Sequence, residues 1–127
     1  METASDKIKT FNSILESFLA QTSSLVGTTY HHYFLKLIKI NAPVPINFAI
    51  KHLLIYKEKI LNKDESYFTN KDVSEFAQVT DNILGEILRL KDIYYKLDED
   101  SKENVWSILQ ALLQLTIEYC EIKNIKY

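Results

Sequence analysis

The sequence predicts an all-α fold: a compact bundle of five to six helices with a central C-terminal helix. Its 127 residues include two glycines and two prolines, too few turn-forming residues for an all-β domain of this length. Apolar residues recur every three or four positions, which is the period of an α-helix. No short β-branched runs alternate with helices, as a βαβ fold would require. At 46% hydrophobic and 25% charged residues, the composition is that of a globular protein, and residues 1–127 are expected to form a single helical domain.

Two helices are expected in the first 40 residues. The first begins near Ser5 and ends in the polar stretch 21–24, with Gly27 in the following loop. Its apolar face comprises Ile8, Phe11, Leu15, Phe18 and Leu19. Its opposite, solvent-facing side carries Lys7, Lys9, Asn12 and Glu16. The second helix is expected from about Thr28 to Ile40.

Pro43 and Pro45 interrupt the chain, because proline disfavours a helical residue before it and lacks a backbone donor. A third helix is then expected from Pro45 to Asn62. Tyr67 and Phe68 are expected to form a short turn that plugs the bundle.

A fourth helix is expected from Asp72, where residues 72–75 resemble a capping box. Gly85 either ends this helix or lies within it, and we favour a break between 83 and 90 followed by a short helix over 91–97. The last helix is expected to start at a capping box over 100–103. Its apolar residues lie on most of its sides, which is typical of a central helix.

The potential catalytic and metal-binding side chains form no recognisable site. His31 and His32 are adjacent and point about 100° apart on a helix, so they cannot share a metal ion as residues four apart can. Cys120 is the single cysteine and is expected to be a packed thiol. No glycine-rich phosphate loop or nucleophile motif is present in the sequence. We therefore expect no enzyme activity, no cofactor and no metal.

The charge pattern argues against nucleic acid as a partner. The net charge is −2, and the 15 basic residues are scattered and are all lysine except Arg89. Residues 1–9 are polar and lack the apolar stretch of a signal peptide, and no apolar run has the roughly 20 residues that a membrane span needs. We expect a protein that is neither secreted nor membrane-spanning.

The eight tyrosines offer the best candidates for a protein interface. Tyrosine buries a large area at low entropic cost and is enriched at interfaces. Tyr30 and Tyr33 flank the two histidines, and Tyr94 and Tyr95 are adjacent, so both of the latter pair cannot face one core. We predict these four residues as an interface, with the alternative that each lies at the edge of the core.

The segment over residues 93–115 carries a further signal. Its characteristic positions are Ile93, Leu97, Lys102, Val105, Trp106, Leu109, Gln110 and Leu112. In this spacing the segment resembles one that recurs in small helical proteins of large nucleocytoplasmic DNA viruses, where the pattern reads roughly I-W-x-x-L-S-x-x-N-K-x-x-I-W-x-Y-L-Q-x-L. Tyr94 stands where that pattern has its first tryptophan, and Ser101 where it has asparagine. Residues 41–45 and 63–68 are more weakly similar to the middle segment of the same proteins.

The resemblance implies a viral helical protein and brings no catalytic residue with it. We predict a non-enzymatic protein-interaction or structural module: a virion component, an assembly subunit or a binder of a host factor, located in the host cytoplasm or the virion. Its partner would be a viral or host protein or a second copy of the chain. One alternative is a host modulator of the cell-death-regulator type that binds a partner helix in a groove. Another is a nucleic-acid-associated protein.

Overall fold

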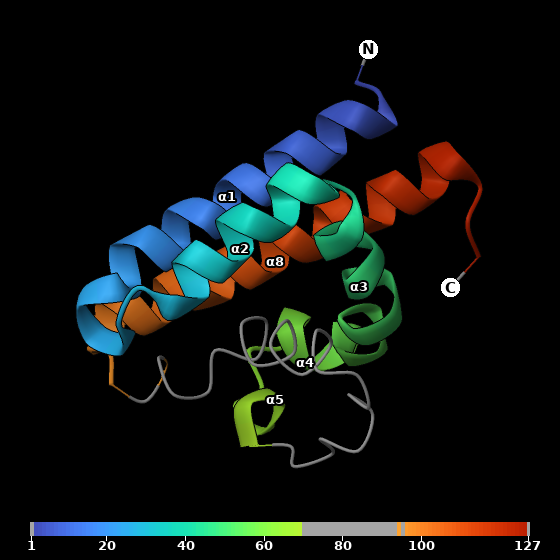
Figure 1. Ribbon diagram of the computed structural model, residues 1–127. Helices are drawn as coiled ribbons and strands as arrows, with labels where there is room; N and C mark the ends of the chain where they lie inside the picture. Colours follow the sequence, from blue (N-terminus) through green and yellow to red (C-terminus); the bar gives the residue numbers. More distant parts are fainter. Residues whose placement is uncertain (1, 70–93, 95, 127) are drawn as a thin grey trace.

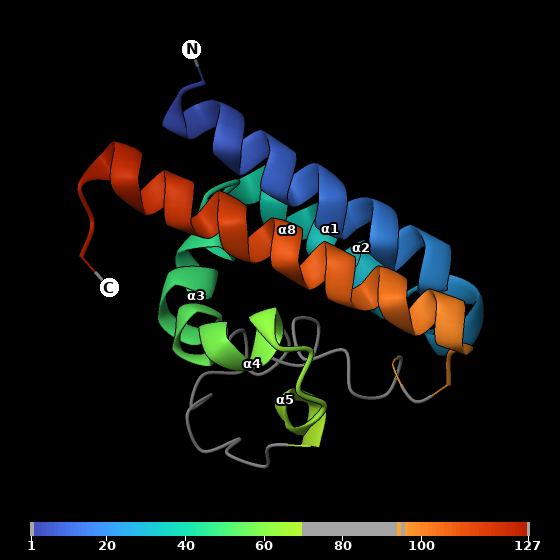
Figure 2. The same cartoon turned by 180° about the vertical axis from the view of Figure 1, so that it is seen from behind.

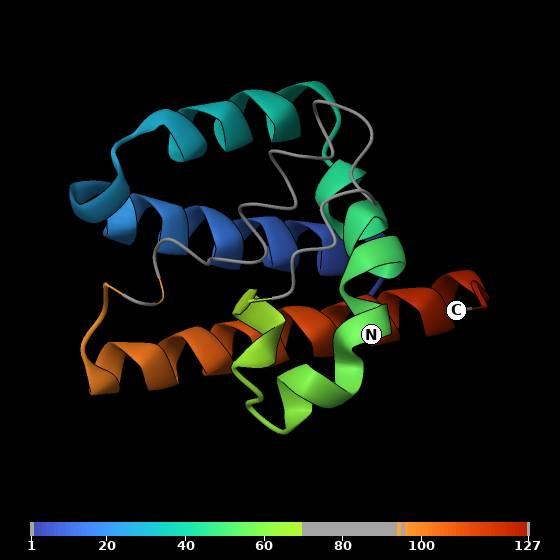
Figure 3. The same cartoon turned by 90° about the horizontal axis from the view of Figure 1, so that it is seen from below.

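The structure, a computed structural model, describes residues 2–69, 94 and 96–126 and is all-α in that part, without a strand. Its helices are α1 (Ala4–Val26), α2 (Thr29–Ile40), α3 (Val44–His52), the 3-10 turn η1 (Leu54–Tyr56), α4 (Lys57–Leu61), α5 (Ser66–Thr69) and α8 (Glu99–Lys123). Helices α1 and α8 run antiparallel along the molecule, so the start of α1 and the end of α8 lie at the same end of the bundle (Figures 1 and 2). Helix α1 lies between α2 and α8 (Figure 3). The predicted fold class is confirmed.

Helix α1 begins and ends at residues with clear capping chemistry. The Thr3 side chain accepts a hydrogen bond from the Asp6 N–H at 3.2 Å, and the Asp6 carboxylate accepts one from the Thr3 N–H at 3.0 Å. This capping box satisfies two N–H groups that the helix itself leaves unpaired. At the other end Gly27 has φ +82°, a conformation that glycine adopts without steric cost. The helix therefore extends past the predicted end at 21–24.

The apolar face of α1 is confirmed, but two polar residues were placed on the wrong side. Phe11 and Leu15 are at most 1% exposed. Lys7 and Asn12, which we expected in solvent, are also buried, because they lie four residues from Phe11 and Ile8 and so share their side of the helix. Each has a polar partner on another part of the chain, which the α1 sequence alone cannot show.

The predicted single helix over 45–62 is wrong. The structure has α3, η1 and α4 in its place. At the break the Tyr56 N–H bonds to the Leu53 carbonyl three residues back, the tighter spacing of a 3-10 turn. The resulting bend brings Ile60 to α8, where the Ile60 carbonyl accepts a hydrogen bond from the Gln110 side chain at 3.2 Å. Each piece keeps the three-four spacing, so the sequence pattern runs through the bend without a signal.

Helix α5 contains Tyr67, one of the two residues expected to fill space in the bundle. Tyr67 is 2% exposed and meets the Tyr56 ring edge-to-face, with ring centroids 5.5 Å apart. The side chain of Phe68 lies outside the described part of the structure. Three further predictions also fall outside the described residues: the helix from Asp72, the break near Gly85 and most of the helix over 91–97.

Helix α8 is central, as predicted, and contacts α1, α3, η1 and α4. Its buried residues share one broad face at about 100° per residue, while the opposite face is exposed, so the buried part of the helix is narrower than predicted: Val105, Trp106, Leu109, Leu112, Leu113, Thr116, Tyr119 and Cys120. Its predicted cap at Asp100 is wrong. The cap is Asp98, which has extended backbone and accepts a hydrogen bond from the Ser101 N–H at 2.8 Å, while Asp100 already lies in the first turn. None of the described helices combines the length and apolarity that crossing a bilayer requires.

Candidate interaction surface

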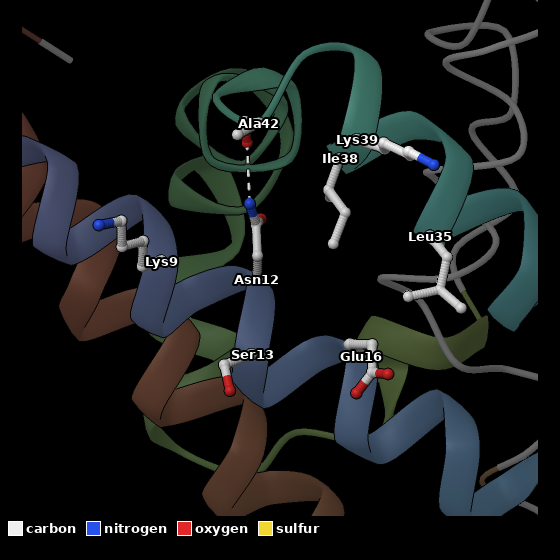
Figure 4. Close-up of a pocket in the computed structure, with 8 residues that line it drawn as sticks. All are labelled: Lys9, Asn12, Ser13, Glu16, Leu35, Ile38, Lys39 and Ala42. Atoms are coloured by element: carbon white, nitrogen blue, oxygen red, sulfur yellow. Dashed lines mark hydrogen bonds between the residues drawn. The ribbon is translucent and has the colours of Figure 1, made fainter.

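A groove of about 640 Å³ lies between α1 and α2 and is open on one side (Figure 4). Its α1 wall consists of Lys9, Asn12, Ser13 and Glu16. Its α2 wall consists of Leu35, Ile38 and Lys39, with Ala42 just beyond the helix end. We refer to these eight residues as the α1–α2 groove. One wall is thus mainly polar and the other mainly apolar.

The helical repeat explains why these residues face one another. Residues three, four and seven positions apart share one side of a helix, and both walls follow that spacing. On α2 the core-facing side is marked by Phe34, which is 0% exposed. Leu35 is the next residue, turned by about 100°, and it remains 37% exposed at the groove. The apolar stripe of α2 is therefore wider than the core needs.

Two polar contacts join the walls of the groove. The Asn12 side-chain amide donates to the Ala42 carbonyl at 2.9 Å (Figure 4). Nε2 of His31 lies 3.2 Å from Oε1 of Glu16. Because both contacts connect α1 with α2 or the turn after it, they hold the two walls at a set separation. Because the protein's own contacts fix the two walls, little conformational freedom is lost when a ligand binds between them.

The groove lining carries two lysines and one glutamate. Lys9 lies on the α1 wall and Lys39 on the α2 wall, and both are exposed. Glu16 is the acidic residue of the groove, and its carboxylate faces His31. Within the described part of the chain, no ion pair involves Lys9 or Lys39. The groove therefore combines an apolar strip with a lysine on each side.

Three of the four tyrosines predicted as an interface lie in the described part of the structure. Tyr30 and Tyr33 are half-buried on α2 and pack against the core. Tyr94 is 3% exposed, and its hydroxyl accepts a hydrogen bond from the Trp106 indole N–H at 3.3 Å. Burial raises the pKa of the Tyr94 hydroxyl. Tyr95 lies outside the described residues. Tyr94 thus belongs to the core in this structure.

His52 and Cys120 pack against other side chains of the bundle. The His52 ring packs on Phe48 with centroids 4.3 Å apart, beside a smaller hollow of about 170 Å³. Cys120 is 0% exposed, and burial raises the pKa of its thiol. No group of three or more metal-binding side chains occurs among residues 2–69, 94 and 96–126.

Sequence reasoning missed the α1–α2 groove. Lys9, Asn12 and Glu16 were expected on a solvated face, and no interface residue was expected at Leu35. One signal was available: Leu35 and Ile38 are apolar and three residues apart, beside the stripe that contains Phe34 and Leu37. The facing of α1 and α2 depends on tertiary packing, so the groove itself had no sequence signal.

The chain resembles proteins of one virus. It is 25% identical over 115 residues to an uncharacterized protein of African swine fever virus, isolate Pig/Kenya/KEN-50/1950, a match that covers 87% of this chain and 89% of that protein. It is 26% identical over 117 residues to the protein of the same description from isolate Tick/South Africa/Pretoriuskop Pr4/1996, with the same coverage. No protein-family model and no solved structure matches the chain.

Proposed function

From the premise that this chain is homologous to an uncharacterized protein of African swine fever virus, a large nucleocytoplasmic DNA virus, we propose that it is a non-enzymatic protein-interaction module of such a virus. It acts in the host cytoplasm or in the virion. It binds a viral or host protein through the α1–α2 groove.

The groove is the observation that carries this proposal. A side chain such as Leu35, 37% exposed beside Ile38 and Ala42, gains free energy when a partner removes it from water. The α1 wall supplies the Ser13 hydroxyl and the Lys9 ammonium group as hydrogen-bond donors, and the α2 wall adds the Lys39 ammonium group. An apolar strip with adjacent polar groups matches the make-up of protein interfaces.

The charge distribution supports a protein partner over nucleic acid. A nucleic-acid interface gains most of its affinity from a cluster of basic residues that release counterions. Here the net charge is −2, and the groove brings only Lys9 and Lys39 to one surface.

Site-specific photo-crosslinking in infected cells tests the proposal. A photoreactive residue at Leu35 is compared with one at Asn104, an exposed position on α8. We expect a discrete crosslinked protein from position 35 and none from position 104, and we expect Ile38→Asp to remove the product. Equal products at both positions, or none at position 35, would contradict the proposal.

A further inference from the structure

We infer that the ligand of the α1–α2 groove is an amphipathic α-helix with acidic residues on both flanks of its apolar stripe. This inference rests on the proposed function and names the chemistry of the partner. It follows from the shape, the length and the charge of the groove.

The shape suits a helix that lies on the surface. The groove volume of about 640 Å³ falls within the roughly 300–1,000 Å³ of ligand pockets. Small-molecule pockets, however, enclose most of their ligand, whereas this groove is open along one side (Figure 4). A long ligand that buries one face and leaves the other in water fits this shape, and an amphipathic helix has those two faces.

The length of the groove determines the spacing of the apolar residues that a ligand helix places in it. The α1 wall runs from Lys9 to Glu16, seven residues, or about 10.5 Å at 1.5 Å per residue. That is about two helical turns. A helix laid along the groove therefore presents apolar residues at positions i, i+4 and i+7 to the strip of Leu35, Ile38 and Ala42.

The charges of the groove determine which residues should flank the apolar stripe of the ligand. Lys9 lies on one wall and Lys39 on the other, and Glu16 is the one acidic residue of the lining, so two ammonium groups stand against one carboxylate. Acidic side chains beside the apolar stripe of the ligand face these ammonium groups, and basic ones meet like charge. Electrostatic complementarity of this kind selects partners more than it adds affinity.

The test uses two designed 18-residue helical peptides with leucine at i, i+4 and i+7, flanked in one by glutamate and in the other by lysine. Binding to the full chain is measured by fluorescence anisotropy. We expect the glutamate peptide to bind about tenfold more tightly, since each exposed charge pair contributes a few-fold and repulsion adds to the difference.

Variants of the full chain test whether the preference between the two peptides arises at the groove. The double variant Lys9→Glu/Lys39→Glu should invert the preference between the peptides. Its matched control, Lys123→Glu/Lys126→Glu, makes the same charge change at exposed residues near the other end of the chain and should leave the preference intact. Leu35→Asp and, as a milder change, Leu35→Gln should weaken both peptides. Circular dichroism establishes that each variant is folded.

Three outcomes of the peptide measurements would overturn the inference: equal affinity for both peptides, no binding of either at about 100 μM, or an equal effect of the control variant. A dimer in sedimentation that Leu35→Asp dissociates would also overturn it, because the occupant would then be a second copy. If the peptides fail while the crosslink at position 35 persists, the proposed function stands and only the acidic helix is lost. If the peptides do not bind and no crosslink forms at position 35, the proposed function and the acidic helix are both contradicted.

Discussion

At the scale of single residues, Lys7 connects the two long helices. Its Nζ lies 2.7 Å from Oε1 of Glu118 and 3.2 Å from Oε2 of Glu2, with the lysine side chain 10% exposed. Hydrogen bonding from Lys7 and then from Gln114 lowers the pKa of Glu118, and the bond to Glu118 raises the pKa of Lys7. The pair is therefore charged in the folded protein across the whole range between pH 4.5 and pH 10.5, the ordinary values of the two groups.

These directions predict how stability depends on pH. Because the pKa of Glu118 is lower in the folded state, its contribution is present above its ordinary pKa of 4.5 and is lost as the pH falls through the folded value. Glu118→Gln should therefore unfold more easily than the wild type at pH 7, and the difference should vanish at strongly acidic pH. Urea titrations at several pH values measure it.

Glu121→Gln is the matched control, because Glu121 is exposed on the same helix and makes no ion pair within the described residues. It should leave the free energy of unfolding near that of the wild type at every pH. If the free energy of unfolding of Glu118→Gln stayed below that of the wild type by a constant amount down to pH 2, lost packing and not charge would be responsible.

Asn12 carries a second prediction, on the groove wall. Its amide donates to the Ala42 carbonyl at 2.9 Å and ties the turn after α2 to α1. Asn12→Ala should lower the free energy of unfolding by about 1 kcal/mol, the usual net value of one hydrogen bond. Ser13→Ala, in the same groove but exposed, should change it by less than about 0.5 kcal/mol. Thermal and urea unfolding compare the two, and equal losses would contradict the assigned role.

Lys7 and Asn12 also show where residue-level prediction from the sequence fails. Their spacing from Phe11 and Ile8 places them on the buried side, but polarity favoured solvent, and polarity was given more weight. The partners that make burial possible, Glu118 and Ala42, are 111 and 30 residues away. A local pattern contains no information about such partners, so burial of a polar residue becomes visible only once the helices are packed.

At the scale of elements, the start of α8 makes a testable distinction. The Asp98 side chain accepts a hydrogen bond from the Ser101 N–H, and this bond lowers the pKa of Asp98. Asp98→Ala should therefore destabilise the protein at neutral pH, whereas Asp100→Ala, already inside the first turn, should have a smaller effect. The Asp98 effect should fade as the pH falls through its folded pKa, below the ordinary 3.8. Thermal unfolding at pH 7 and pH 2.5 measures both, and a larger loss for Asp100→Ala would refute this cap.

Elements were predicted well where apolar spacing decides them and poorly where backbone geometry does. The long helices α1, α2 and α8 each carry a sustained three-four pattern, and their existence followed from it. The 3-10 turn at 54–56 did not follow from the pattern, because the three-four spacing of apolar residues continues from α3 through the turn into α4. Glycine or proline would have marked a break, and neither occurs between 46 and 62.

At the scale of the whole molecule, the position of α8 was predictable and the groove was not. A long helix with a broad apolar face needs several neighbours to bury that face, and α1, α3 and α4 pack against α8. The groove arises from the distance and angle between α1 and α2, which the turn over 41–43 and the contacts of Asn12 and Glu16 set. These are relations between elements, and no single segment encodes them.

The central position of α8 makes Cys120 a probe of global unfolding. The residue is 0% exposed, so a reagent reaches its thiol when α8 separates from its neighbours. Because unfolding of a stable domain is rare, native Cys120 should react with a disulfide reagent at least about a thousandfold more slowly than in the unfolded chain. The free energy derived from labelling in increasing urea should equal that from circular dichroism. Asn104→Cys in a Cys120→Ala background, exposed on the same helix, should react without protection. If native Cys120 reacts as fast as this control, α8 opens locally and the bundle does not unfold as one unit.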